Sequence, residues 1–293
     1  MNNYNVLNRF FSRSTFEEIL LGHNTSCYGE IVKRYAIDQK GTNGAVISSI
    51  YSILSSQYRN EYFYKNTLLN NLIIKKHKLY TTKVLTELPI NKSIADFVTL
   101  NGKAIAYEIK TELDNLDRIE AQVKDYYKCF PYVCIVTCES HLAKVKELFA
   151  NTNVGIYWFS KRNSIKVEQE PQPEFGYLDY SALFKLLRKY EFESILKNHF
   201  HELPQVSQFD YYSECYKWFL KIDIDIVLNE MLAVLKQRCR IQIEKFEQVP
   251  LELKMLVYQS NYSDEKYSRL EEFLNATYVD GGTNNYVFSL FEG

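Results

Sequence analysis

The order of strand-like and helix-like runs between residues 84 and 160 constrains the fold more than any other feature of this sequence. Five runs have the period-two alternation or the apolar composition of β-strands. They cover residues 84–88, 93–100, 104–109, 132–137 and 154–159. Apolar residues at helical spacing fill 114–127 and 141–149, between the last three strand-like runs. This order predicts an α/β fold, a mixed β-sheet flanked by helices.

Helical patterns also fill both flanks of this segment. They recur at 6–21 and 45–54, and a longer pattern opens at residue 58 and ends in the basic run 75–78. The Pro171-Gln172-Pro173 segment marks a boundary. Beyond it, helical patterns cover 180–196, 223–246, 251–258 and 264–274. The predicted organisation is a helical N-terminal extension (1–58), an α/β core (59–170) and a helical C-terminal region (171–293).

Composition narrows the class of protein. Hydrophobic residues make up 46% of the 293 residues, enough for a sizeable core. No run approaches the roughly 20 apolar residues of a membrane helix, and the N-terminus lacks the layout of a signal peptide. We therefore expect a cytoplasmic protein without a membrane partner. The six cysteines include no C-x-x-C pair, so we expect free buried thiols.

Acidic residues are scarce in one stretch of the chain. Eight lysines lie between Glu61 and Lys110 but only four acids, the other three being Glu87, Asp96 and Glu108. Asp96 and Glu108 lie inside apolar strand-like runs, where a carboxylate is costly unless it is paired or binds a metal. The net charge of −1 does not by itself indicate a nucleic-acid partner.

The turn at Asn101-Gly102 decides whether Asp96 and Glu108 share a face of the sheet. A two-residue loop would put them on opposite faces. A three-residue loop that begins at residue 100, with the glycine in the left-handed conformation, would pair Thr99 with Lys103. Asp96 would then lie diagonal to Glu108, at ~7–8 Å between Cα atoms. We predict the three-residue loop.

Two carboxylates at this separation can share one divalent ion. Mg²⁺ is commonly held by one or two carboxylates and the substrate phosphate, and Mn²⁺ is the alternative ion. Such an ion lowers the pKa of a bound water and neutralises charge on the attacked phosphodiester. Lys110, on the same face as Glu108, would orient or activate that water and stabilise the developing charge. The surrounding lysines would bind the polyanion, more weakly as salt increases.

Asp96, followed after eleven residues by Glu108-Ile109-Lys110, resembles the D…E-x-K signature of the PD-(D/E)XK, or restriction-endonuclease-like, nuclease superfamily. The element order of residues 84–160 is similar to the core of that superfamily. Gln122-x-x-x-Tyr126, on the next helix, is similar to the Q-x-x-x-Y element of its exonuclease-like branches. The resemblance covers about a hundred residues. It departs at Ser93-Ile94-Ala95, where many members have Pro or Arg, and this leaves the subfamily and the substrate open.

The resemblance implies a role for each matching residue. Asp96, Glu108, Lys110 and Gln122 would form the catalytic set, with Asp96 and Glu108 as metal ligands. Glu61, at the start of a helix ahead of the first strand, would be an additional ligand. A first-turn acid favoured by the helix dipole explains Glu61 equally well. Glu87, at the end of the first strand-like run, is a competing candidate.

We therefore expect a Mg²⁺-dependent nuclease, with DNA favoured over RNA by the resemblance alone, in repair, restriction or defence. The rival is a catalytically silent nuclease-like module that binds nucleic acid or a protein partner. A structural carboxylate pair neutralised by Lys110 is a further alternative. Residues 171–293 carry no recognisable chemistry. They would pack on the core or form an interface, in a homo-oligomer or with a protein partner.

Overall fold

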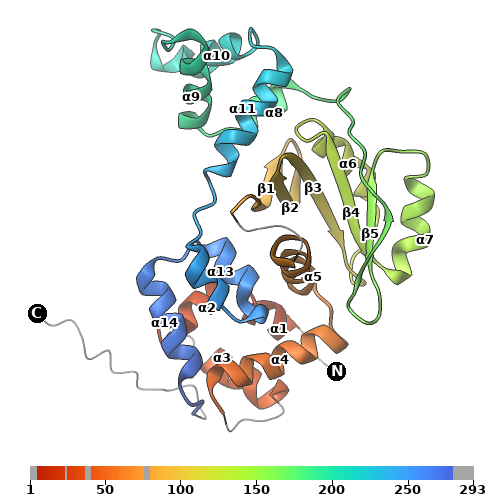
Figure 1. Ribbon diagram of the computed structural model, residues 1–293, viewed down its shortest axis with the longest axis vertical. Coiled ribbons are helices and arrows are strands. Elements are labelled where there is room, and N and C mark those ends of the chain that lie inside the picture. Colours follow the sequence, from red (N-terminus) through yellow and green to blue (C-terminus); the bar gives the residue numbers. More distant parts are fainter. Residues whose placement is uncertain (1–4, 24, 37–40, 76–79, 280–293) are drawn as a thin grey trace, which may run out of the picture. The chain divides into compact units, whose positions relative to one another are not determined.

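The computed structural model describes residues 5–23, 25–36, 41–75 and 80–279, which fall into two compact units (Figure 1). One unit combines Met1–Lys76 with Ile241–Gly293, and the other is His77–Arg240. This division differs from the expected three parts. Helices up to residue 240 share a core with the sheet, whereas the last helices join those of the N-terminal segment.

The first unit is helical and draws on both ends of the chain. The predicted helix over 6–21 is two helices, because Ser12 caps the second by accepting the N–H of Thr15. Lys76, His77 and Lys78 of the basic run lie outside the described residues. The elements are α1 (Asn5–Phe10), α2 (Arg13–Leu20), α3 (Thr25–Tyr35), α4 (Asn43–Gln57), α5 (Glu61–Leu68), a π-helix (Leu69–Lys75), α12 (Ile243–Gln248), a 3-10 turn (Leu251–Leu253), α13 (Lys254–Ser260) and α14 (Asp264–Asn275).

Two buried asparagines join the distant segments of this unit. The Asn43 amide donates to the carbonyl oxygen of Phe273 at 2.9 Å. The Asn66 amide donates to the carbonyl oxygen of Leu251 at 2.9 Å and accepts the N–H of Met255 at 3.0 Å. Both side chains are 1% exposed, so these bonds satisfy polar groups that water does not reach.

The second unit contains a six-stranded mixed sheet in the order β1-β2-β3-β4-β5-β6. Strands β1 to β3 are antiparallel, β3 to β5 are parallel, and β6 is antiparallel to β5. The five predicted strands are confirmed. The sixth was not expected, because it is short and mostly exposed. The strands are β1 (Lys83–Ile90), β2 (Ser93–Asn101), β3 (Lys103–Lys110), β4 (Tyr132–Cys138), β5 (Gly155–Phe159) and β6 (Ile165–Gln169).

The turn between β2 and β3 is tighter than predicted. Asn101 pairs with Lys103 around Gly102, whose φ of +65° is the expected left-handed conformation. The predicted pairing of Thr99 with Lys103 is wrong, since Thr99 pairs with Ile105. The register shifts by two residues rather than one, so each side chain stays on its expected face of the sheet.

Two helices connect the parallel strands and cover one face of the sheet. They are α6 (Ile119–Tyr127) and α7 (Glu139–Leu148). Ile119 and Val145, one from each helix, share a buried core with Ile135 of β4. These helices form the layer that covers the Asp96 and Glu108 side of the sheet.

The start of α6 differs from the prediction. The helical spacing predicts a helix from residue 114, but α6 begins after Arg118, which makes no side-chain cap bond. Asp114 instead accepts the backbone N–H of Thr111 at 2.8 Å, which closes a local turn after β3.

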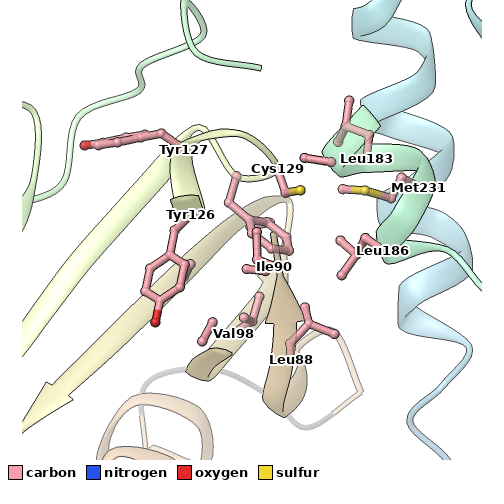
Figure 2. Close-up of a cluster of buried hydrophobic side chains, with 14 of the residues drawn as sticks. Leu88, Ile90, Val98, Tyr126, Tyr127, Cys129, Leu183, Leu186 and Met231 are labelled. Carbon is pink, nitrogen blue, oxygen red and sulfur yellow. The ribbon is translucent and has the colours of Figure 1, made fainter. Parts of the chain in front are cut away.

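Four further helices belong to the same unit and continue its core. The predicted helix over 180–196 is divided at Leu187, and α10 was not expected. Leu183, Leu186 and Met231 of these helices join Leu88 of β1 in one buried cluster (Figure 2). The helices are α8 (Tyr180–Leu186), α9 (Lys189–Phe200), α10 (Gln208–Phe219) and α11 (Ile224–Lys236).

The segment at Pro171 is fixed to the sheet rather than free. A Cβ atom at Gly155 of β5 would lie 2.7 Å from the Cδ of Pro171, so only glycine permits this approach. The N–H of Gln172 donates to the carbonyl oxygen of Asn153 at 2.9 Å. The chain therefore passes from the sheet to α8 in contact with the sheet.

The six cysteines are free; Cys239 is partly exposed and the other five are buried, as predicted. In the described part of the chain, no helix combines the length and apolar character needed to cross a bilayer.

Candidate functional site

The end of β3 carries a buried ion pair. Glu108 is 2% exposed, and its Oε1 lies 2.8 Å from the Nζ of Lys110. Alternation along β3 places both side chains on the face that carries Ala106 of the apolar core. The Lys110 side chain is 12% exposed, so the pair lies where the core meets the surface. An unpaired carboxylate would be costly at this depth, and Lys110 compensates its charge.

Helix α6 holds both members of this pair. The Oε1 of Gln122 accepts a hydrogen bond from the Nζ of Lys110 at 3.0 Å. One turn later, the Tyr126 hydroxyl is hydrogen-bonded to the Glu108 carboxylate and lies 2.7 Å from the carbonyl oxygen of Ile94. Gln122 and Tyr126 lie on one face of the helix because they are four residues apart. Both oxygens of Glu108 are therefore engaged.

Asp96 approaches the pair from β2. The β2–β3 ladder ends at Phe97 and Tyr107, and continuing its register by one residue puts Asp96 across from Glu108. The Oδ2 of Asp96 accepts the backbone N–H of Ile109 at 2.8 Å. Asp96 is partly exposed, in contrast to Glu108. The two carboxylates thus lie on neighbouring strands at the point where the strands cease to pair.

A second group of contacts ties the start of β2 to α6. Asp125 is 8% exposed, and its Oδ1 accepts from the Asn91 amide at 2.6 Å and from Lys128 Nζ at 2.9 Å. Its Oδ2 accepts from the Ser93 hydroxyl at 2.8 Å. Asn91 forms the β1–β2 turn with a φ of +54°, a conformation that asparagine tolerates better than most residues. Helix α6 therefore contacts both β2 and β3.

Two pKa shifts follow from these contacts. Burial, together with the neighbouring Glu108 and Asp96, raises the pKa of Tyr126, so its phenol stays neutral and retains its proton for hydrogen bonding. Burial alone would raise the pKa of Asp125, but hydrogen bonds from Asn91, Lys128 and Ser93 outweigh it. The pKa of Asp125 is therefore below its ordinary value, and the group is ionised at neutral pH.

The donor chemistry of Asp96 and Glu108 fits a hard divalent ion. Two carboxylates match the protein share of a Mg²⁺ site, where waters and substrate phosphate complete the coordination. In the described ranges, no group of three or more His, Cys, Asp or Glu side chains is arranged to hold a metal ion. An ion bound at Glu108 Oε1 would take the place of the Lys110 ammonium, which lies 2.8 Å from that oxygen.

The predicted site residues fall in both units. Asp96, Glu108, Lys110 and Gln122 lie together in the second unit, at the end of β3 and under α6. Glu61 belongs to the first unit, where it begins α5 and pairs with Lys65 Nζ at 2.5 Å. Its role as a metal ligand stays a prediction.

The competing candidate, Glu87, is an exposed residue of β1. Its φ of +52° is unusual for a glutamate, and the β1–β2 ladder omits the pair it would form with Asp96. The backbone is therefore distorted beside Asp96, on the strand next to it.

Sequence reasoning missed Asn91, Ser93 and Asp125, and it assigned Tyr126 no role of its own beyond the Q-x-x-x-Y element. One signal was available, because Asp125 directly precedes two tyrosines on the apolar side of a predicted helix. An acid in that position needs partners. No local pattern shows that those partners lie in a turn more than thirty residues earlier.

Known proteins place the chain in a phage family. The family described as Bacteriophage P4 protein cII matches residues 55–255, more than half of the chain. Protein cII of Enterobacteria phage P4 is 29% identical over 94 residues, which cover 31% of this chain and 35% of that protein. The match thus spans about a third of the length of this curated relative. No solved structure matches the chain. From the extent of the family match, the chain belongs to the family of bacteriophage P4 protein cII.

Proposed function

We propose that this protein is a metal-dependent nuclease of the PD-(D/E)XK type. It would hydrolyse phosphodiester bonds in DNA in preference to those in RNA. The observation that carries the proposal is the meeting of Glu108 and Lys110 with Gln122 of α6, beside Asp96 on the adjacent strand. These are the residues of the D…E-x-K resemblance. A restriction-endonuclease-like fold is part of the same proposal, supported by the order of strands and helices around them.

Each residue of the site would have a distinct role. Asp96 and Glu108 would bind Mg²⁺ or Mn²⁺, which supplies Lewis-acid activation of water and neutralises charge on the phosphate. Lys110 would donate hydrogen bonds to the negative charge that develops on the phosphate. Gln122 orients the Lys110 ammonium, and Tyr126 holds the Glu108 carboxylate in place.

One observation favours a second candidate, a silent nuclease-like module that binds nucleic acid or a protein. Glu108 is 2% exposed, and Lys110 and Tyr126 engage both of its oxygens. A carboxylate satisfied in this way is stable without a metal. The module would keep the fold and the polyanion-binding lysines and lack hydrolysis.

Cleavage assays separate the two candidates. Supercoiled plasmid, linear double-stranded DNA, single-stranded DNA and RNA would each be incubated with Mg²⁺, Mn²⁺ or EDTA. The variants are Asp96→Asn, Glu108→Gln and Lys110→Met, which change charge with little change in size. Glu120→Ala, an exposed acid on α6, is the matched control.

We expect metal-dependent cleavage by the wild type and the control, lost by at least about 100-fold in the three site variants. Equal cleavage by the wild type and the folded Glu108→Gln variant would refute the nuclease proposal. No cleavage of any substrate, together with salt-sensitive binding of DNA, would favour the silent module.

A further inference from the structure

The two candidate metal ligands lie on strands that separate at the site. The backbone ladder between β2 and β3 ends at Phe97 and Tyr107, one residue short of Asp96 and Glu108. A divalent ion shared by two carboxylates tolerates little error in their separation, because Mg²⁺ demands near-ideal geometry. The spacing of the two strands at this point therefore matters for any ion bound there.

Helix α6 bridges the separated strands with side chains. Toward β3, it holds Glu108 through Tyr126 and Lys110 through Gln122. Toward β2, it holds the residues just before Asp96: Asp125 accepts from Ser93, and Tyr126 lies against the carbonyl oxygen of Ile94. Ser93 lies three positions before Asp96, so its bond to Asp125 acts about 10 Å along the strand from the Asp96 carboxylate.

Asp125 is the centre of the contact with β2. Its two oxygens accept from three donors, and two of these, Asn91 and Ser93, belong to the β1–β2 turn and the first residue of β2. The third donor, Lys128, follows α6 itself and links Asp125 to neither strand. Asp125 is buried and ionised, so it has no ready substitute partner in water.

We propose that Asp125 is a positioning residue that fixes the start of β2 on α6 through Asn91 and Ser93, and so sets the separation of Asp96 and Glu108 for a divalent ion. This rests on the proposed function. It adds a determinant of metal affinity that touches neither the ion nor the substrate. Asp125 lies outside the D…E-x-K and Q-x-x-x-Y elements.

The test measures binding of Mn²⁺ to the full chain by the loss of free-ion paramagnetic signal, with no substrate present. Asp125→Asn keeps the size of the side chain but removes its charge. Ser93→Ala removes one donor, and Asn91→Gly removes the other while keeping the left-handed turn. Lys128→Ala is the matched control, because it also removes a donor to Asp125 but none to β2. Asp96→Asn reports whether binding occurs at the site.

We expect Asp125→Asn to weaken Mn²⁺ binding by about 10-fold, the lower end of the effect of outer-shell partners on metal affinity. Ser93→Ala and Asn91→Gly should each weaken it several-fold, and either change combined with Asp125→Asn should add little. Lys128→Ala should stay close to the wild type. Cleavage by Asp125→Asn should recover at saturating Mn²⁺, which a general loss of structure would not allow.

Two results would overturn the inference while leaving the proposed function intact. One is unchanged Mn²⁺ affinity in Ser93→Ala and Asn91→Gly when Asp96→Asn abolishes binding. The other is an equal loss of affinity in Lys128→Ala, which would make the effect one of charge rather than position. If Asp125→Asn does not fold, the two donor variants decide. Failure of the wild type to bind Mn²⁺ through Asp96 would instead reject the proposed function, and this inference with it.

Discussion

The carboxylate of Asp96 replaces a strand-to-strand hydrogen bond by accepting the backbone N–H of Ile109 at 2.8 Å. The contact lies just beyond the last backbone pair of β2 and β3, where the strands separate. It gives Asp96 a structural role besides its proposed chemical one. The two roles respond differently to substitution, because one needs a hydrogen-bond acceptor and the other needs a charge.

Substitutions at Asp96 should therefore separate stability from activity. Asp96→Asn keeps a carbonyl oxygen that can accept the Ile109 N–H, so its free energy of unfolding should stay within about 0.5 kcal/mol of the wild type. Asp96→Ala leaves that N–H without its acceptor and should lose about 1–2 kcal/mol. Both variants should lack metal-dependent cleavage. Urea unfolding and plasmid cleavage measure the two effects, and equal stability of the variants would argue against the hydrogen bond.

Adjacent tyrosines on α6 should differ in the effect of losing a hydroxyl. Tyr126→Phe removes the hydrogen bond to Glu108 and the contact with Ile94, so it should lower the free energy of unfolding by about 1–3 kcal/mol. In the described chain, the buried Tyr127 hydroxyl has no hydrogen-bond partner. Tyr127→Phe should therefore be neutral or slightly stabilising. A larger loss in Tyr127→Phe than in Tyr126→Phe, measured by urea unfolding, would contradict this assignment.

A buried ion pair ties the segment just after α11 to the first turn of α9. Arg238 contacts both oxygens of Glu191, at 2.7 and 2.5 Å, and Glu191 is 1% exposed. Arg238→Met would leave the buried Glu191 carboxylate without its charge partner and should destabilise the second unit by about 3 kcal/mol. Lys144→Ala breaks the exposed Lys144–Glu147 pair at 3.0 Å and should cost less than about 0.5 kcal/mol. Thermal unfolding at pH 7 measures the loss of stability in each variant. Similar losses would show that burial does not make the Arg238–Glu191 pair the stronger one.

The same pair gives the second unit an acid-sensitive contribution to stability. Burial would raise the pKa of Glu191, but hydrogen bonds from Arg238 and from the Arg188 backbone dominate, and the pKa lies below its ordinary 4.5. The contribution is present above pH 4.5 and is lost as the pH falls through the folded pKa. The stability difference between wild type and Arg238→Met should therefore shrink in that range. A difference that stays constant down to pH 3 would contradict it.

Lys254, in the first unit, should also make stability rise with pH, but in the alkaline range rather than the acidic one. Burial lowers its pKa to about 8 from the ordinary 10.5, so between these values the unfolded chain binds more protons than the folded one. Stability from this group should therefore rise with pH across that window, by ~1–2 kcal/mol between pH 7.5 and 9.5. Urea unfolding of wild type and Lys254→Met isolates the effect from other titrating groups. A difference that does not change with pH would show that Lys254 titrates normally.

The sequence determined the identity and order of the elements around the site. Period-two alternation and short apolar runs predicted five of the six strands, and a local glycine predicted the left-handed turn at Gly102. Side-chain alternation then put Asp96, Glu108 and Lys110 on one face, even though the predicted register was wrong by two residues. Such features depend on neighbours a few residues apart, and that is why a single sequence carries them.

Only the tertiary structure decided how the ends of the chain combine and what holds the site. Residues 241–279 pack with the N-terminal helices through partners such as Asn43 and Phe273, which are 230 residues apart. Asp125 accepts hydrogen bonds from Asn91 and Ser93, which lie more than thirty residues earlier in the chain. Buried polar groups take whichever partner the packed backbone brings near them. Local sequence shows that such a group needs a partner, and the packing of helix against sheet determines which one it finds.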